Sequence, residues 1–178
     1  MNGRDALALL RAAVPAAEGE AWADLGAGTG TFTRTLAELV GREGRVFAVD
    51  ADDRALDAVR AWAGGARGGA AVEVVHADVT GPLEVPTLDG VLMANVLHFV
   101  RDAEAALSGI VARLRPGGRL VLIEYEGRRP GPWTPYPVSA ARFRDLAAGA
   151  GLSPPEVVAR RPSAYGGEIY VAVAARER

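Results

Sequence analysis

The most constraining feature of this sequence is a glycine-rich segment between a predicted strand and a predicted helix. Residues 21–25 are apolar enough for a buried strand, and the apolar residues of 31–40 have helical spacing. Between them lies Gly26-Ala27-Gly28-Thr29-Gly30, shortly after Asp24. A strand, a glycine turn and a helix form a unit that binds nucleotides, because glycine lets the backbone approach a ligand closely and the helix N-terminus begins there. The segment therefore predicts an α/β fold with a nucleotide-like ligand at this turn.

Strand and helix patterns alternate along the rest of the chain. Further strands are predicted over 45–49, 72–76, 88–94, 120–123, 156–159 and 169–174, and further helices over 5–13, 53–63, 103–114 and 139–148. Alternation of this kind predicts a parallel sheet with helices on both faces, and the last two strands follow each other as a hairpin. We expect an α/β fold with a seven-stranded, mostly parallel sheet and a C-terminal antiparallel hairpin.

The length of 178 residues fits a single domain. In this interpretation residues 1–19, with a helix stopped by Pro15, form an N-terminal helical cap, and residues 20–178 form the core. Residues 64–71 are expected to form a surface loop. A longer loop, 127–137, is rich in proline and aromatic residues and follows a strand at the end of the sheet where parallel sheets bind ligands.

Composition excludes several kinds of chemistry. The chain has no cysteine and no lysine, which removes thiolate nucleophiles, cysteine-ligated metals and Schiff-base chemistry, and we expect no metal site. The net charge is -2 and the pI is about 5.7, so no basic footprint for nucleic acid is present. No segment approaches the ~20 apolar residues of a membrane span, and no signal peptide is recognisable, so we expect a soluble cytoplasmic protein.

The spacing of the glycines separates the nucleotide-binding turns from one another. A dinucleotide fingerprint would need a third glycine where Thr31 stands, and a phosphate-binding loop would need a lysine. The acidic Asp24 before the turn suits a positively charged ligand better than a pyrophosphate. These observations favour a ligand without phosphates.

At these residues the chain resembles the class I S-adenosylmethionine-dependent methyltransferases, whose first motif is an acidic residue followed by GxGxG. The resemblance extends from residue 22 to residue 173 and includes 89–99, which is similar to the family's fourth motif, and 114–120, which is similar to the turn before its fifth strand. It implies a Rossmann-like methyltransferase fold and S-adenosyl-L-methionine as the cofactor.

The resemblance also implies a role for each acidic residue at a strand end. Asp50 would bind both ribose hydroxyls, which one carboxylate can accept together. Asp78 would contact the adenine amino group, and the backbone of Val79 would read the ring edge. The cofactor-binding residues implied in this way are Asp24, Gly26, Ala27, Gly28, Gly30, Asp50, Ala51, Asp78, Val79, Ala94 and Asn95.

Each acidic residue also has an interpretation without a ligand. Asp50 could cap the following helix, although Asp52 and Asp53 are better placed for that. Asp78 could form an Asx turn before residues 80–82. Asp24 could act through water or orient the turn.

Candidates for the methyl-acceptor side follow the fourth and fifth strands. His98 is one of two histidines and is a candidate general base, as is Glu124. Candidate substrate-binding residues are His98, Tyr125, Trp133 and Tyr136. The alternatives are that His98 packs beside its neighbour in the sequence and that the aromatic loop folds upon itself.

The leading functional hypothesis is an S-adenosylmethionine-dependent methyltransferase that acts on a small-molecule acceptor by in-line transfer. Ala94-Asn95-Val96-Leu97 departs from the Asn/Asp-Pro-Pro-Tyr signature of enzymes that methylate amino nitrogens of bases or glutamine, so such acceptors are not expected. The alternatives are a non-catalytic S-adenosylmethionine-binding protein and a nicotinamide-dependent oxidoreductase. The expected partner is a small molecule rather than nucleic acid or a membrane, and the chain is expected to be a monomer or homodimer.

Overall fold

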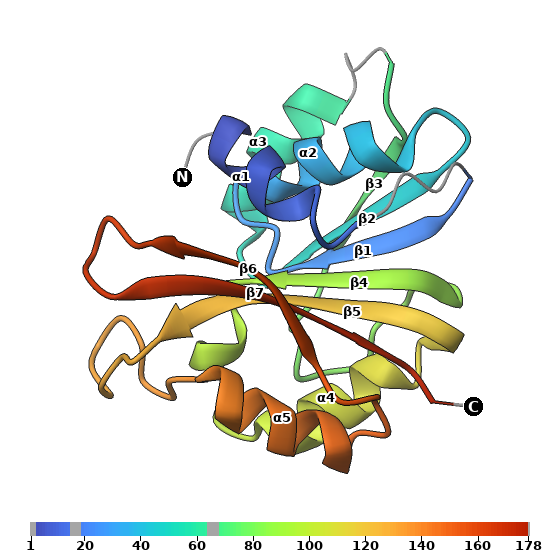
Figure 1. The fold of residues 1–178 in the computed structure, drawn as a ribbon. Helices are drawn as coiled ribbons and strands as arrows, with labels where there is room; N and C mark the ends of the chain where they lie inside the picture. Colours follow the sequence, from blue (N-terminus) through green and yellow to red (C-terminus); the bar gives the residue numbers. More distant parts are fainter. Residues whose placement is uncertain (1–2, 15–18, 64–67, 178) are drawn as a thin grey trace.

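The structure, a computed structural model, describes residues 3–14, 19–63 and 68–177 (Figure 1). The order of its elements is α1 (Gly3–Leu10), β1 (Ala21–Leu25), α2 (Thr31–Val40), β2 (Arg45–Asp50), α3 (Asp53–Ala63), β3 (Ala71–His76), β4 (Leu88–Ala94), the 3-10 turn η1 (Leu97–Phe99), α4 (Ala103–Val111), β5 (Leu114–Glu126), α5 (Ala140–Gly149), β6 (Glu156–Pro162) and β7 (Glu168–Ala175). Strands and helices alternate as the sequence predicts.

The strands form one seven-stranded sheet in the order β3-β2-β1-β4-β5-β7-β6. β1 to β5 pair in parallel, whereas β7 runs antiparallel to both β5 and β6. This arrangement confirms the predicted fold class. The chain moves outward from β1 to β3 and then returns to place β4 on the other side of β1, where Leu25 pairs with Met93. Parallel α/β sheets bind ligands at such a switch point, at the carboxyl ends of the strands.

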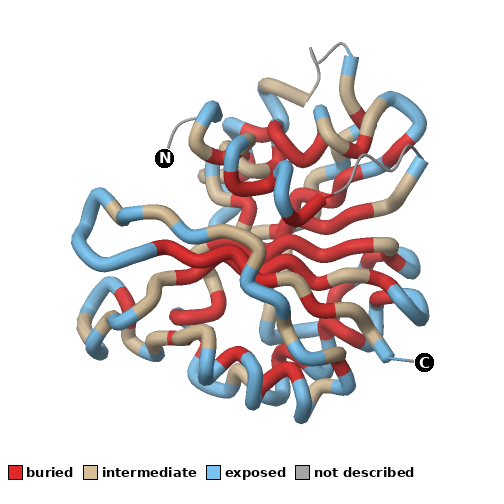
Figure 2. Tube along the Cα trace, viewed as in Figure 1, coloured by how far each residue is buried: buried red, intermediate tan, exposed pale blue. Residues whose placement is uncertain are grey.

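Helices cover both faces of the sheet, with α1, α2 and α3 on one side and α4 and α5 on the other (Figure 1). The central strands are buried between the two layers (Figure 2), and two apolar clusters fill the space on either side. Trp22 is fully buried in one of them, directly over Gly90, where an added Cβ would lie 2.4 Å from the indole ring. The strand ends that carry the candidate site are therefore held by a rigid, close-packed core.

The prediction was wrong in the segment between α4 and β5. A helix was predicted over 103–114, but α4 ends at Val111, and Leu114 already pairs with Leu88 as the first residue of β5. Leu114 is fully buried, and the Leu88 N–H donates to the Arg113 carbonyl at 2.8 Å. Sheet pairing thus replaces the last helical turn, and the register shift between Leu88 and Gly90 accommodates the glycines within the strand.

Other boundaries differ by smaller amounts. α1 spans Gly3–Leu10, so it begins two residues earlier and ends three residues earlier than the predicted helix 5–13. β6 extends beyond the predicted 156–159 because it pairs with β7 as far as Pro162. Side chains cap the N-termini of α4 and α5, since Asp102 accepts from the N–H of Ala105 and Ser139 from that of Arg142. Pro15 and residues 64–67 of the predicted surface loop lie outside the described residues.

Candidate active site

The glycine turn follows β1 and passes directly over the start of the segment after β4. The N–H groups of Gly26 and Ala27 both donate to the Val49 carbonyl, at 2.8 and 3.0 Å, which ties the turn to β2. Gly26 has φ +78°, and a Cβ there would lie 2.0 Å from Cγ2 of Val96. Gly28 has φ +53° and open space beside it, and Gly30, at φ +85°, precedes α2. Only glycine fits at 26, and the turn leaves open space beside the backbone at 28.

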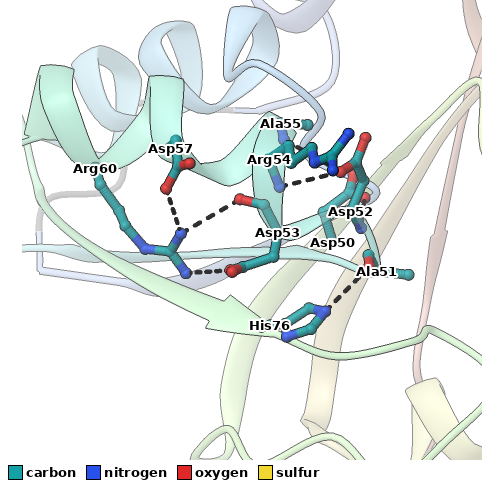
Figure 3. A network of polar contacts seen from close by, with 9 residues as sticks. All are labelled: Asp50, Ala51, Asp52, Asp53, Arg54, Ala55, Asp57, Arg60 and His76. Atoms are coloured by element: carbon teal, nitrogen blue, oxygen red, sulfur yellow. Dashed lines mark hydrogen bonds and ion pairs between the residues drawn. The ribbon is translucent and has the colours of Figure 1, made fainter.

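Asp50 ends β2 and its carboxylate faces the glycine turn. Oδ2 accepts from the N–H of Gly28 at 2.7 Å, and Oδ1 accepts from the N–H of Asp52 at 2.8 Å. Asp52 in turn accepts from the N–H of Arg54 and so begins α3, as Figure 3 shows. Asp50 therefore does not cap α3, and each of its oxygens keeps a further lone pair for a ligand. Figure 3 also shows His76, whose Nε2 lies 3.0 Å from the Ala51 carbonyl oxygen.

Asp78 follows β3 and forms the Asx turn that the sequence permits. Its Oδ1 accepts from both the backbone N–H and the hydroxyl of Thr80, at 2.8 and 2.7 Å. These hydrogen bonds, the backbone one first, lower the pKa of Asp78 below its ordinary value. Within the described residues, Oδ2 makes no hydrogen bond. The carboxylate is thus ionised, oriented and able to accept from a ligand.

Asp24 lies below the surface of the site, with its side chain buried at the end of β1. It is 1% exposed, and its Oδ2 accepts from the hydroxyl of Thr33 at 2.7 Å, which links β1 to α2. Burial, together with the negative charge of Asp50, outweighs this hydrogen bond and raises the pKa of Asp24 to about 7. A direct contact between Asp24 and the cofactor stays a prediction.

One cavity, which we call the acidic cavity, lies at the ends of β1 to β4 and has a volume of about 480 Å³. Six of the predicted cofactor-binding residues line it, namely Gly26, Asp50, Ala51, Asp78, Val79 and Asn95. The rest of its lining consists of Thr80, Val96, Phe99, Val100 and Arg101. Ala27 and Ala94 are buried instead, and Gly28 and Gly30 lie outside the lining.

A second cavity, which we call the aromatic cavity, has a volume of about 520 Å³. His98, Tyr125 and Trp133 of the predicted substrate-binding residues line it, together with Asn95, Phe99, Arg128, Thr134 and Tyr165. Tyr136 does not, but its N–H donates to the His98 carbonyl at 2.9 Å and so anchors the loop 127–137 to η1. Asn95 and Phe99 line both cavities, which therefore adjoin.

His98 and Glu124 form a buried pair at the wall of the aromatic cavity. His98 is 2% exposed and Glu124 fully buried, and His98 Nδ1 lies 2.7 Å from Glu124 Oε2. The backbone N–H of His98 also donates to Oε1 of the same carboxylate, at 3.2 Å. The structure thus brings the two candidate bases into direct contact, while their part in catalysis stays a prediction. The fixed ring also stacks near Phe99, with ring centroids 4.3 Å apart.

Two buried side-chain atoms lack a hydrogen-bond partner within the described residues, and both belong to the aromatic cavity. They are Oδ1 of Asn95 and Nε of Arg128, two residues that line this cavity. Asn95 is also the one non-glycine residue with positive φ, +58°, among the residues described. Buried polar atoms are normally paired, so these two unpaired atoms need an explanation, and a bound ligand is one.

Sequence reasoning missed Arg128, Phe99 and Tyr165. Arg128 and Phe99 lie within or next to segments already selected, so proximity to the strand ends could have indicated them. Tyr165 comes from the turn between β6 and β7, and no sequence signal joins it to Arg128, whose Nη2 donates to its carbonyl at 2.7 Å.

A third cavity lies away from these residues. It measures about 600 Å³ and is lined by α1, α2 and neighbouring residues, including Arg4, Thr31, Arg34 and Glu38. It contains none of the predicted site residues and shares no lining residue with the other two cavities. Among the residues that the structure describes, no group of histidine and acidic side chains could hold a metal ion, and no helix is long and apolar enough to cross a membrane.

The model of one protein family, described as a methyltransferase domain, matches residues 23–122, more than half of the chain. The chain belongs to the methyltransferase-domain family. The match covers the glycine turn, Asp50, Asp78 and η1, and it favours the predicted class I S-adenosylmethionine-dependent methyltransferase over an oxidoreductase.

Individual relatives agree with this membership. The chain is 34% identical over 108 residues to the ubiquinone/menaquinone biosynthesis C-methyltransferase UbiE of Klebsiella pneumoniae, covering 60% of this chain and 43% of that protein. It is similar in structure to a Burkholderia thailandensis 1,6-didemethyltoxoflavin-N1-methyltransferase with bound 1,6-didemethyltoxoflavin and S-adenosylhomocysteine (TM-score 0.73, 25% identity, 99% of this chain and 78% of that chain).

An arsenic(III) S-adenosylmethionine methyltransferase from Chlamydomonas reinhardtii has the same fold, with a TM-score of 0.78 and 22% identity over 99% of this chain and 73% of that chain. The chain matches less than half the length of the curated relatives mentioned above and of similar ones. The family and the fold are thereby established for this chain.

Proposed function

We propose that this chain transfers a methyl group from S-adenosylmethionine to a small-molecule acceptor by in-line displacement. The observation that carries the proposal is the pair of adjoining cavities, which share Asn95 and Phe99. One cavity presents carboxylates from strand ends and the other presents aromatic side chains. A donor in the first and an acceptor in the second would meet at the shared wall, as a displacement reaction requires.

The residues of the acidic cavity fit S-adenosylmethionine, which has positive charge and no phosphate. Asp50 would accept from the ribose hydroxyls through the lone pairs that its two backbone contacts leave open. Asp78 Oδ2 would accept from the adenine amino group, and the open space beside Gly28 leaves room for the ligand. When bound, the cofactor supplies a methyl group activated by its sulfonium.

The protein's own contribution is then alignment and exclusion of water. Holding two reactants in a reactive geometry is worth ~7 to 11 kcal/mol in well-oriented systems. The aromatic cavity, at about 520 Å³, has the size of a small-molecule site. An acceptor of this kind is also supported by the relative that methylates 1,6-didemethyltoxoflavin.

His98 is the candidate base for an acceptor that must lose a proton. The Glu124 carboxylate can only accept hydrogen bonds, so His98 Nδ1 donates to it at 2.7 Å and Nε2 keeps its lone pair. Nε2 would take the acceptor's proton, and the negative Glu124 would stabilise the imidazolium that forms. Glu124 thus positions His98 rather than reacting itself.

Calorimetric titration with S-adenosylhomocysteine and with NADH tests the cofactor, and release of S-adenosylhomocysteine across an acceptor panel tests catalysis. We expect binding of the first ligand only, and turnover with at least one small acceptor. NADH binding in place of S-adenosylhomocysteine would refute the proposal. Cofactor binding without turnover across the whole panel would refute its catalytic half and identify a non-catalytic binding protein.

A further inference from the structure

The aromatic cavity contains a guanidinium group that no carboxylate neutralises. Seven arginines of the described chain form ion pairs with acidic side chains, namely Arg45, Arg60, Arg115, Arg119, Arg142, Arg160 and Arg161, whereas others, such as the exposed Arg129 and Arg144, form none. Arg128 is half-buried and forms none within the described residues. We infer that Arg128 binds an anionic oxygen of the methyl acceptor, and that this acceptor is a planar aromatic molecule carrying such an oxygen. The inference rests on the proposed function, because it names the acceptor class of that site.

The contacts of Arg128 hold it in place but do not satisfy it. Its Nη2 donates to the Tyr165 carbonyl at 2.7 Å, and its Cζ lies 4.9 Å from the centre of the Tyr125 ring. Its Nε is buried without a partner. A planar guanidinium with an unused donor matches a carboxylate or phenolate oxygen, and burial beside aromatic rings strengthens such a pair.

The remaining walls favour a flat ring. Phe99, Trp133 and Tyr165 are 54%, 84% and 76% exposed, and all three line this cavity. Large aromatic side chains exposed together at a cavity indicate a binding surface rather than a packing surface. Aromatic rings stack on planar ligands with offset or tilted geometry, which a linear aliphatic molecule does not exploit.

Asn95 supplies the other end of the site. Its Oδ1 is buried without a donor, and Asn95 lies on the wall shared with the acidic cavity. A hydroxyl or ring N–H of the methyl acceptor would donate a hydrogen bond to Oδ1 there. This hydroxyl or N–H would then face the acidic cavity, while the anionic oxygen of the same molecule faces Arg128. The two unpaired atoms thus define an orientation as well as a class of molecule.

The competing interpretation is that Arg128 only fixes the loop 127–137 to the turn between β6 and β7. Arg128→Gln distinguishes the two roles, because glutamine removes the charge but keeps an N–H donor for the Tyr165 carbonyl. Arg129→Gln is the matched control, since Arg129 is the adjacent exposed arginine and does not line the cavity.

The experiment measures binding of 3-hydroxy-2-naphthoate and of its methyl ester by calorimetry, with and without saturating S-adenosylhomocysteine. We expect the acid to bind the wild-type protein about tenfold more tightly than the ester, Arg128→Gln to remove this preference, and Arg129→Gln to retain it. A second pair, 4-nitrophenol at a pH where it is ionised and 4-nitroanisole, separates phenolate from carboxylate as the preferred anion.

Equal affinity for acid and ester, and for 4-nitrophenol and 4-nitroanisole, in the wild-type protein would overturn the inference, as would an unchanged preference in Arg128→Gln. Binding of S-adenosylhomocysteine is measured in the same samples and is expected to be equal in the three proteins. Its absence in the wild-type protein would refute the proposed function, whereas a charge preference that depends on Arg128 would still support the anion site.

Discussion

Substitution of Gly26 by alanine tests whether close contact at the switch point sets the shape of the acidic cavity. Gly26 has φ +78°, a conformation that costs a residue with a Cβ about 1 to 2 kcal/mol. The new Cβ would also lie 2.0 Å from Cγ2 of Val96, so Val96 must move, and such overpacking costs about 1 to 3 kcal/mol more. Gly26→Ala should therefore lower the free energy of unfolding by roughly 2 to 5 kcal/mol.

Two further variants separate these contributions. Gly28→Ala carries only the conformational cost, about 1 to 2 kcal/mol, because φ is +53° and nothing lies within 4 Å of the added Cβ. In a Val96→Ala background the clash with Cγ2 is absent, so the cost of Gly26→Ala should fall toward that of Gly28→Ala. The coupling between positions 26 and 96 should thus be about 1 to 3 kcal/mol.

Urea unfolding followed by far-ultraviolet circular dichroism measures the free energy of unfolding of each variant. An equal slope of this free energy against urea concentration in all variants shows that each exposes the same surface on unfolding. The same cost for Gly26→Ala with valine and with alanine at 96 would refute the contact as the cause. A loss no greater than that of Gly28→Ala would refute it equally.

Three other predictions concern the acidic and histidine residues. Asp50→Ala should weaken S-adenosylhomocysteine binding by about 1.5 to 3 kcal/mol in calorimetric titration. Asp52→Ala, which removes a helix cap, should leave this affinity unchanged. Equal affinities in both variants would contradict the role of Asp50 in cofactor binding. Because the pKa of Asp24 is raised from 3.8 to about 7 in the folded protein, the unfolded state releases its proton first and stability is lost as the pH rises through this interval. Asp24→Asn should lack that loss, which amounts to about 4 kcal/mol between about pH 4 and about pH 8. Urea midpoints of the two proteins that shift in parallel between these pH values would be inconsistent with this prediction. His98→Ala leaves the fully buried Glu124 without its ring partner and should lower the free energy of unfolding by about 3 to 5 kcal/mol. Adding Glu124→Ala to this variant should restore part of the loss. Strictly additive losses in urea unfolding would exclude coupling between the two residues.

The parts of the fold that depend on local patterns were predictable from the sequence. The bounds of β1, α2, α3 and β4 agree with prediction because short apolar runs, helical spacing and glycines mark them directly. The start of β5 was not predictable in this way. Residues 112–114 continue the predicted helix, and only pairing with Leu88 on β4 converts Leu114 to a strand residue.

The residues of the candidate site likewise fall into two groups, those that sequence motifs indicate and those that only long-range contacts bring together. The family resemblance implied that Asp50, Asp78 and Asn95 bind one cofactor. They line the same acidic cavity because the carboxyl ends of parallel strands meet at one edge of a sheet, and their contacts with the cofactor stay a prediction. Arg128 and Tyr165 meet only because the hairpin of β6 and β7 folds back beside β5. Periodicity and motif spacing carry no information on such a long-range contact between two loops.

The two cavities should differ in how much substitution their walls tolerate, because one wall belongs to the sheet and the other to loops. Asn95 follows the central strand β4, and its N–H donates to the Ile123 carbonyl at 2.8 Å, so the wall shared by the cavities is part of the sheet's hydrogen-bonding framework. Its positive φ is a conformation that asparagine tolerates better than other side chains, and it turns the chain sharply into η1. The outer wall of the aromatic cavity consists instead of Arg128, Trp133 and Tyr165, which belong to loops. Loops accept substitution and changes in length without disturbing a core. In the function proposed above, the choice of acceptor can therefore change at these loops while the strand ends keep the same methyl donor.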